Sequence, residues 1–351
     1  MFKILTKEKV NISSNALRVT LSVFKKIFNI LLILLFVNSA HAAEEKTNGK
    51  LNRNGCGKNY SSLVLEDDGT ILFDTRAEKI SYPASLTKVM TVYLTLEAIE
   101  NNRLSLDQSL TVSAFGAEIS KVNKNNTLRL KEGSKITVRE AIQSIIVKSF
   151  NEAAVTLAEA VSGDEWKFVR KMNEKAEELG MIQTSFRNST GLHAEGQYTT
   201  AYDLARLTIA IKRDFPEYYR LFALKKFIYN GAKYDSHNHV LLEYKGAEGM
   251  KTGFTNASGF NLISIAKKDD KRVISVLMGC STFKSRDQFT KKLFDKAFFR
   301  NYEPEIKVKL KTKFDYNKNV SSSLILQSKI KDLVRLEFRV KFREILQTQV
   351  T

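Results

Sequence analysis

A serine and a lysine three residues apart are the first side chains in this sequence that are suited to chemistry. Ser85 and Lys88 lie in "YPASLTKVMTVY", at the start of a run whose apolar spacing predicts a helix. On a helix, side chains at positions i and i+3 are neighbours, and the N-terminus offers free N–H groups beside the hydroxyl. The pair is therefore suited to forming a nucleophilic alkoxide. The alternative is a capping serine next to a solvated lysine.

The pair becomes specific only through two later motifs. Ser-x-x-Lys occurs five times in the sequence, so by itself it carries little information. Ser149-Phe150-Asn151 and Lys251-Thr252-Gly253 follow Ser85 in chain order, and Lys-Thr-Gly occurs once. The ordered set Ser-x-x-Lys, Ser-x-Asn, Lys-Thr-Gly is typical of serine penicillin-binding proteins and β-lactamases.

Four longer segments resemble the low-molecular-weight penicillin-binding proteins that are D-alanyl-D-alanine carboxypeptidases (serine peptidase family S11). They are "PASLTKVMTVY", "NSTGLHAEGQYTTAYDLA", "GMKTGFTNASGFNLISIA" and "VLMGCSTFKSRD", and the resemblance covers about residues 60–300. It implies an α/β fold of the β-lactamase/transpeptidase type, an antiparallel sheet flanked by helices plus an all-helical subdomain. It also implies removal of the terminal D-alanine from peptidoglycan stem pentapeptides through an acyl-enzyme on Ser85, in cell-wall biogenesis and remodelling, with β-lactams as inhibitors.

The resemblance implies catalytic roles for Ser85, Lys88 and Ser149. A serine hydroxyl needs a neighbouring base to become a good nucleophile, and Lys88 is the candidate. Burial and the positive charge of Lys251 would both lower the pKa of Lys88, so that its amine can accept a proton. Ser149 would relay that proton to the nitrogen of the leaving D-alanine.

The same resemblance implies the substrate-binding residues Asn151, Lys251, Thr252, Gly253, Phe254 and Arg286. Asn151 would hold Lys88 or a substrate amide through side-chain hydrogen bonds. The family's oxyanion hole maps to the backbone N–H groups of Ser85 and Phe254.

The far end of the expected site would receive the terminal carboxylate of the substrate. Thr252 and Arg286 would bind it, because a guanidinium pairs well with a planar anion. The alternative for Arg286 is a surface arginine at the start of a helix. No cofactor and no metal are expected, because the histidines of "HNH" at 237–239 have no cysteine or carboxylate at metal-ligand spacing.

These residues need a scaffold, and the pattern of the sequence predicts one. Two strands are expected in "SSLVLEDDGTILFDT" around an Asp-Gly turn, and "GMKTGFT", "GFNLISIA" and "RVISVLMG" predict three more, the last two joined by "KKDDK". Apolar periodicity and a Thr200-x-x-Asp203 capping box predict helices over residues 85–101, 138–147, 151–161, 164–179, 201–213 and 285–299. Strands at both ends with helices between them predict an α/β core that carries a helical insertion.

The ends of the chain predict further segments. Residues 1–42 have a basic flank, a short apolar run and small residues at Ala40 and Ala42, which predicts a secretory signal and a periplasmic protein; an uncleaved membrane anchor is the alternative. Residues 43–52 are expected to be a linker and 53–300 the catalytic domain. Residues 301–351 are expected to form a short, truncated C-terminal domain rich in β-structure, because "RLEFRVKFR" alternates with period two.

Charge and cysteine content limit the partners and the redox state. The formal net charge is +18, which allows anionic membrane, cell wall or nucleic acid as a partner. An exported protein meets lipid and wall first, so a peripheral contact with anionic membrane is compatible with the charge, whereas nucleic acid is not expected. Export permits a disulfide, but Cys280 ends an apolar run, and the interpretation favoured for the two cysteines is a buried free thiol.

Other functions remain open at the level of the sequence. A β-lactamase of the same fold would need a group that positions the deacylating water, and no matching glutamate loop is evident between Asn151 and Lys251. A DD-endopeptidase would use the same residues as the carboxypeptidase. A non-catalytic wall-binding protein would not need the intact motifs, and a nucleic-acid binder is suggested by charge alone.

Overall fold

The computed structural model describes residues 56–122, 127–299 and 310. The expected signal, linker and C-terminal segment (residues 1–42, 43–52 and 301–351) lie outside the described residues. Within these residues, no helix is both long enough and apolar enough to span a membrane.

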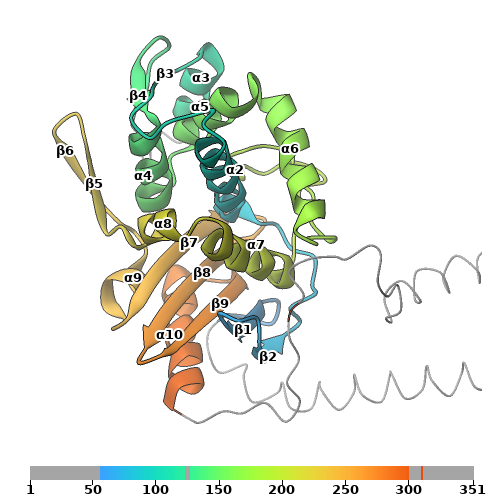
Figure 1. The fold of residues 1–351 in the computed structure, drawn as a ribbon. Helices are drawn as coiled ribbons and strands as arrows, with labels where there is room; N and C mark the ends of the chain where they lie inside the picture. Colours follow the sequence, from blue (N-terminus) through green and yellow to red (C-terminus); the bar gives the residue numbers. More distant parts are fainter. Residues whose placement is uncertain (1–55, 123–126, 300–309, 311–351) are drawn as a thin grey trace, which may run out of the picture.

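A five-stranded antiparallel sheet forms one layer of the molecule (Figure 1). Its strand order is β2-β1-β9-β8-β7, with bounds Ile71–Thr75, Ser61–Glu66, Lys271–Cys280, Gly259–Lys268 and Ala247–Thr255 respectively. The hairpin around the Asp-Gly turn and the three later strands are those predicted from the sequence. Of the strands that the structure describes, the first (β1) pairs with the last (β9), and β7 lies at an edge of the sheet.

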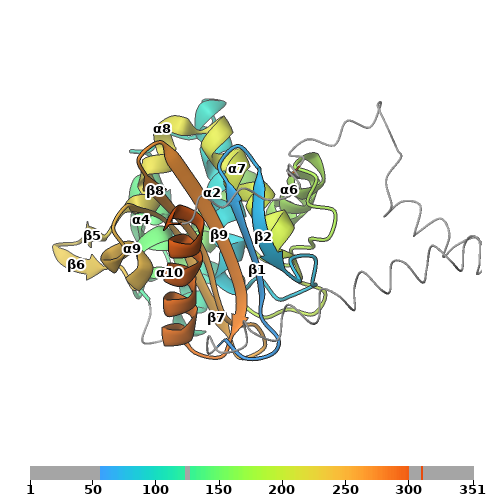
Figure 2. The same ribbon diagram turned by 90° about the horizontal axis from the view of Figure 1, so that it is seen from below.

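The two faces of the sheet bury different sets of side chains. Successive residues of a strand point to opposite faces, so Leu63 and Leu65 pack toward α2 and α7, whereas Val64 packs toward the other side. That other side is covered by α10 (Phe283–Phe299), through Phe289 and Phe294. Figure 2 shows α10 on one face of the sheet and α2 and α7 on the other.

A helical region is inserted between β2 and the later strands, as the sequence predicts. It comprises the 3₁₀ turn η2 (Ala84–Thr87), α2 (Lys88–Glu100), α3 (Ala114–Val122), α4 (Val138–Lys148), α5 (Asn151–Ser162) and α6 (Glu165–Glu178), with the short hairpin of β3 (Ser109–Thr111) and β4 (Lys135–Thr137). The return to the sheet runs through α7 (Ala201–Asp214), α8 (Pro216–Tyr219), η3 (Arg220–Ala223), the hairpin of β5 (Lys226–Tyr229) and β6 (Ala232–Asp235), and α9 (His239–Glu243).

Side-chain caps fix where several of these helices begin. Thr137 and Glu140 form a reciprocal capping box at α4, and Asp164 caps α6. Thr200 caps α7 as predicted, but the carboxylate of Asp203 accepts hydrogen bonds from Gln183 and Thr184 in the preceding loop. The expected capping box at α7 is therefore only half formed. Its acidic residue, Asp203, instead joins the preceding loop to the helix.

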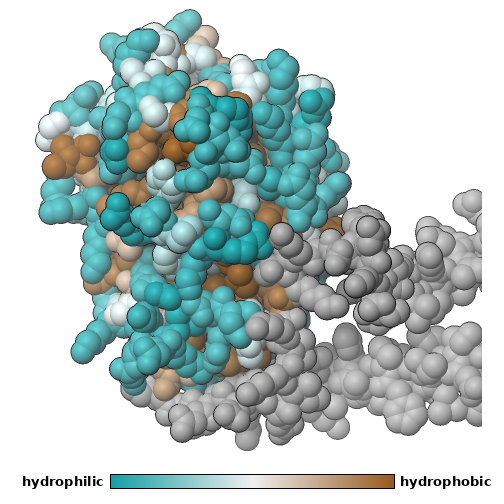
Figure 3. Space-filling view, viewed as in Figure 1, coloured by the Kyte–Doolittle hydropathy of each residue, from teal (hydrophilic) through white to brown (hydrophobic). Residues whose placement is uncertain are grey.

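The surface in Figure 3 is mainly hydrophilic over the described residues, with apolar groups scattered across it. Isolated exposed apolar side chains such as Trp166, which is 70% exposed, are ordinary for a soluble domain. Trp166 stacks with the guanidinium of Arg170 on the outside of α6, so it does not contribute to the core.

Three local predictions need correction. The helix expected from Ser85 begins with the 3₁₀ turn η2, and α2 starts at Lys88. The last helix begins at Phe283 instead of residue 285, because the Thr282 hydroxyl accepts from the backbone N–H of Ser285 and caps it. Neither α3 nor the two short hairpins were predicted from the sequence. Each of them has only two to five apolar residues, which is too few to show a hydrophobic period.

The two cysteines are joined, which corrects the expectation of a buried free thiol. Both are buried as expected for Cys280, but Cys56 and Cys280 form a disulfide across 224 residues of sequence. The bond links the segment before β1 to the end of β9. Two half-cystines so far apart in sequence give no local signal, and only the pairing of β1 with β9 brings them together.

We predict that replacing both cysteines, Cys56→Ala with Cys280→Ala, lowers the free energy of unfolding by up to about 5 kcal/mol, because the disulfide closes a very long loop in the unfolded chain. Urea unfolding, followed by circular dichroism, measures this. Adding a reductant should lower the stability of the unaltered protein to the same extent and leave the double variant unchanged. Equal unfolding midpoints for oxidised and reduced protein would contradict the prediction.

Candidate active site

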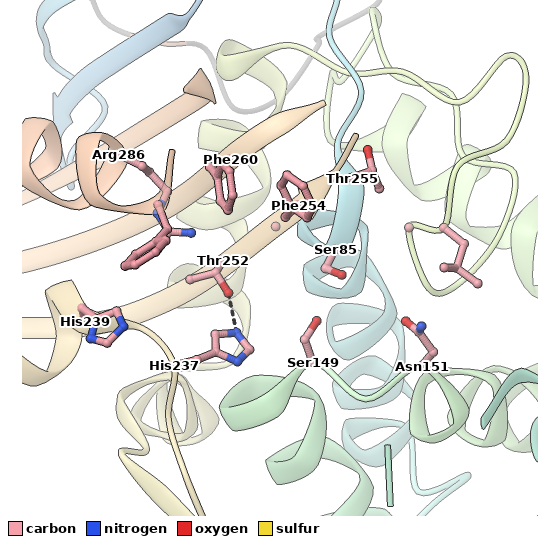
Figure 4. A pocket seen from close by; sticks show the side chains of 14 residues that line it. Ser85, Ser149, Asn151, His237, His239, Thr252, Phe254, Thr255, Phe260 and Arg286 are labelled. Atoms are coloured by element: carbon pink, nitrogen blue, oxygen red, sulfur yellow. Dashed lines mark hydrogen bonds between the residues drawn. The ribbon is translucent and has the colours of Figure 1, made fainter. Parts of the chain in front are cut away.

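The predicted site residues come together where the helical region meets the edge strand β7. Ser85 lies on η2, and Ser149 and Asn151 lie at the junction of α4 and α5. Thr252 comes from β7 on the opposite side. Figure 4 shows the side chains of all four residues around one pocket.

The amine of Lys88 is the most highly connected group of the site. Its Nζ lies 3.2 Å from Ser85 Oγ, 2.8 Å from Asn151 Oδ1 and 2.5 Å from the carbonyl oxygen of Thr190. Lys88 is fully buried, and this burial lowers the pKa of its amine to about 7, although the nearby Glu152 carboxylate acts in the opposite direction. About half of the amine is therefore neutral at neutral pH.

The charged form of Lys88 can donate to all three of these oxygen atoms, whereas the neutral form, which is the one that can act as a base, has two N–H groups and one lone pair for them. The Thr190 carbonyl and the Asn151 side-chain oxygen only accept, so they take its two N–H groups. Its lone pair then faces the Ser85 hydroxyl, which can donate. The arrangement leaves Lys88 oriented as an acceptor for the Ser85 proton.

The 3₁₀ geometry of η2 favours this contact. Residues three apart are nearly eclipsed in a 3₁₀ turn, which places the Lys88 side chain over Ser85. An α-helix was expected to bring the side chains of Ser85 and Lys88 together. The contact is therefore as predicted, although Ser85 lies on a 3₁₀ turn.

The loop that supplies the Thr190 carbonyl was not assigned a role in the sequence analysis, although it lies in the quoted segment "NSTGLHAEG". The partly buried carboxylate of Glu165 accepts hydrogen bonds from the backbone N–H of Ser189 at 2.7 Å and from its hydroxyl at 3.0 Å. Next to it, Gly191 has a φ of +78°, and a Cβ there would lie 1.9 Å from the carbonyl oxygen of Ala84. The loop is therefore pressed against η2, and glycine is required at that position.

Ser149 sits at the end of α4 in a left-handed conformation, with a φ of 65°. Its Oγ is buried and has no hydrogen-bond partner within the described residues. A buried hydroxyl without a partner is uncommon, and this one lines the pocket beside Ser85 (Figure 4). It is thus available to a bound molecule.

Lys251 is buried beneath the same surface, on β7, where its Nζ donates to the carbonyl oxygen of Thr252 at 2.8 Å. Burial lowers the pKa of its amine well below the usual value, and the charges of Lys88 and Arg286 lower it further. Burial and the charge of Lys251 were both expected to lower the pKa of Lys88, and burial is the cause that lowers it. The repulsion between the two ammonium groups is mutual, so the pair does not hold two protons readily.

The backbone of β7 packs directly on that of η2. A Cβ on Gly253 would lie 3.2 Å from the backbone nitrogen of Ser85, so only a very small residue allows this approach. The Asn261 side chain donates to the carbonyl oxygens of Tyr82 and Pro83, at 3.0 and 3.2 Å, and holds the chain just before Ser85 on the sheet. The predicted oxyanion residues Ser85 and Phe254 are thus neighbours across this contact.

The pocket has a volume of about 400 Å³. It is lined by Ser85, Ser149, Asn151, Gly191, Leu192, His237, His239, Thr252, Gly253, Phe254, Thr255, Phe260, Phe283 and Arg286. Arg286 is only 4% exposed and is paired with Asp287 at 2.7 Å, so the alternative of a surface arginine is wrong. Phe254 is 49% exposed and stacks on Phe260 at the rim.

Among the described residues, the lining of the pocket contains the Arg286 guanidinium and no carboxylate. Across the described part of the chain, His, Cys, Asp and Glu side chains form no group of three or more that could hold a metal ion.

A solved structure with this architecture places the fold among the penicillin-binding proteins. Penicillin-binding protein D2 from Listeria monocytogenes, solved in its ampicillin-bound form, matches with a TM-score of 0.59 and 31% identity, over 68% of this chain and 96% of that protein. The fold class predicted from the sequence is confirmed.

Sequence comparison defines the family. The profile of the D-alanyl-D-alanine carboxypeptidases, peptidase S11, matches residues 59–282. The carboxypeptidase DacF of Bacillus subtilis is 33% identical over 78% of this chain, and DacD of Escherichia coli is 37% identical over 66%. The chain belongs to this family, and it spans 71% of the length of DacF and 61% of that of DacD.

We predict that Gly191→Ala lowers the free energy of unfolding by about 3 kcal/mol, because the new Cβ collides with backbone that cannot move without displacing η2. Gly163→Ala is the matched control. Gly163 also has a positive φ, +86°, but a Cβ there meets nothing within 4 Å, so it should cost only about 1 kcal/mol. Urea unfolding of both variants tests this, and equal losses would show that the contact with Ala84 does not matter.

Proposed function

We propose that the protein is a serine-type D-Ala-D-Ala carboxypeptidase that removes the terminal D-alanine from peptidoglycan stem peptides. The observation that carries the proposal is the buried Lys88 amine, held by Asn151 and the Thr190 carbonyl so that its lone pair faces the Ser85 hydroxyl. Family membership and the cationic end of the pocket support the same reaction.

In the acylation step, Ser85 Oγ attacks the carbonyl carbon of the penultimate D-alanine while Lys88 accepts the hydroxyl proton. The negative charge that develops on the carbonyl oxygen is stabilised by the backbone N–H groups of Ser85 and Phe254. β7 is an edge strand, so one side of its backbone can face the substrate.

Collapse of the tetrahedral intermediate breaks the amide bond and releases D-alanine. The leaving nitrogen needs a proton, and the unpartnered Ser149 hydroxyl can give it its own while taking from Lys88 the proton that came from Ser85. Water then attacks the ester on Ser85, gives a proton to the same base and releases the shortened peptide. Lys251 holds the backbone of β7 through the carbonyl oxygen of Thr252, and Asn151 holds Lys88 in place.

The free carboxylate of the substrate is the group that defines a carboxypeptidase. Thr252 and the buried guanidinium of Arg286 both line the pocket and offer donors to it. Asp287 holds the guanidinium through two contacts, at 2.7 and 2.8 Å, so it is positioned before the substrate arrives.

Penicillin would acylate the same serine, and the acyl-enzyme should be long-lived. No carboxylate lines the pocket among the described residues, and Glu165 is engaged by Ser189. A dedicated base for deacylating water is therefore missing from the lining, which favours the carboxypeptidase over the β-lactamase. An additional DD-endopeptidase activity would use the same residues.

We also propose that the protein is exported to the periplasm through residues 1–42, and that residues 53–300 form the catalytic domain. The basic composition supports a peripheral contact with anionic membrane lipid. Vesicle binding by the protein with and without residues 301–351 tests the contribution of that segment; undiminished binding by the shortened chain would exclude it.

The first test of the activity is Ser85→Ala. We predict that this variant releases no D-alanine from a pentapeptide and forms no band with a fluorescent penicillin on a denaturing gel, because both depend on an ester to Ser85. The unaltered protein should do both. Release of D-alanine by Ser85→Ala at the normal rate would show that another group is the nucleophile.

The second test is the pH dependence of acylation. Because the pKa of Lys88 is lowered to about 7, the neutral, proton-accepting form grows as the pH rises through 7, and the rate constant for penicillin acylation should rise with it and then level off. Lys88→Arg keeps a cation that cannot act as a base, so it should lose about 10²-fold or more at every pH. A rate independent of pH between 5 and 9 would argue against Lys88 as the base.

A further inference from the structure

His237 is a pocket residue to which neither the sequence motifs nor the proposed reaction gives a role. It lies in the link between β6 and α9, is partly buried, and places Nε2 2.7 Å from the hydroxyl oxygen of Thr252. The dashed line in Figure 4 marks this contact. His237 belongs to the "HNH" stretch, and its ring is directed at the hydroxyl that is proposed to meet the substrate carboxylate.

The surroundings of His237 keep its ring neutral. Burial lowers the pKa of the imidazole to about 3, and the neighbouring charges that contribute most, those of Lys251, Lys148, Arg286 and His239, are all positive. A neutral imidazole carries one N–H and one bare nitrogen. The contact with Thr252 can therefore exist in two forms that differ only in where the proton lies.

The two forms differ in whether the Thr252 hydroxyl offers its proton or an oxygen lone pair to a ligand in the pocket. If Nε2 carries the proton, it donates to Thr252 Oγ1, and the threonine proton is free to point at a ligand. If Nε2 is bare, it accepts the threonine proton, and Oγ1 turns a lone pair to the ligand. A carboxylate accepts hydrogen bonds and is repelled by a lone pair, so a bound carboxylate selects the first form.

We propose that His237 is a positioning residue that donates from Nε2 to Thr252 and thereby aims the threonine hydroxyl proton at the terminal carboxylate of the substrate. The chain Nε2–H···Oγ1–H···carboxylate is one in which each hydrogen bond strengthens the next. His237 touches neither the scissile bond nor the carboxylate, and it acts only through Thr252. The inference rests on the proposed function, because it needs a substrate with a free carboxylate.

The test uses two thioester substrates that differ only in that carboxylate: an N-acyl-D-alanyl thioester of mercaptoacetic acid, and the methyl ester of the same compound. Ser85 attacks the same thioester carbonyl in both. We expect His237→Asn to lower kcat/KM for the acid roughly ten- to hundredfold, the range of a hydrogen bond to a charged group, and to leave kcat/KM for the methyl ester nearly unchanged. Asparagine reaches only as far as Nδ1 and cannot donate at the Nε2 position.

His237→Gln is the matched control, because its amide N–H reaches the position of Nε2. It should recover most of the activity on the acid. In a double-mutant cycle, His237→Asn should add no further loss to Thr252→Val, since the histidine acts through the threonine hydroxyl. Thermal melting of each variant shows that it is folded, and the comparison between acid and methyl ester is internal to each protein.

Each outcome supports or overturns one claim. Equal losses on the acid and the methyl ester, or equal losses for His237→Gln and His237→Asn, would overturn the role of His237 and leave the proposed function standing. Additive losses in the cycle would do the same. If the unaltered protein and Ser85→Ala hydrolysed both thioesters at the same rate, the proposed function itself would fail.

Discussion

The site depends on removing the Lys88 amine from water. A buried ammonium is costly, so burial lowers the pKa of Lys88 to about 7 and makes its neutral form accessible. Three partners, all of them oxygen atoms, hold its Nζ in place. Those partners come from three segments that are far apart in sequence: η2, the α4–α5 junction and the loop at Thr190. These contacts therefore hold the amine of Lys88 beside Ser85, and they also join η2 to the start of α5 and to the loop at Thr190.

The sheet supplies the second wall, and its edge strand is shaped for this purpose. Among the described residues, β7 has no strand on its outer side, and the absence of a side chain at Gly253 lets its backbone reach that of Ser85. Asn261, one strand further in, holds the chain before Ser85 by two carbonyls. A reactive serine on a short 3₁₀ turn is thus fixed from both sides by rigid elements, which is what an arrangement of donors for a developing oxyanion requires.

The sequence predicted the elements with strong periodicity and the site residues that lie in motifs. The five sheet strands and the helices that carry Lys88, Ser149 and Asn151 were expected, and these residues converge as the motifs implied. The role of Thr190 was not predictable, because every residue has a backbone carbonyl and the residue type does not show which one makes a contact. The disulfide was missed because Cys56 and Cys280 become neighbours only through the pairing of β1 with β9, and His237 was considered only as a metal ligand.

The order of the strands has a consequence for how the chain folds. β1 and β2 can form a hairpin early. The other edge of β1 is paired only with β9, which lies some two hundred positions further along the chain. The helical region in between is rich in local contacts and can form first, whereas closure of the sheet must wait for a pairing of high sequence separation, which is slow. The partners of Lys88 lie in η2, at the start of α5 and in the loop at Thr190, so they need not wait for that closure. Lys251 and Phe254 belong to β7, and they reach the segment that carries Ser85 only when β7 packs on η2. A partly folded chain with its helical region formed would therefore hold Ser85 and Lys88 together but would lack the wall of the site that β7 supplies.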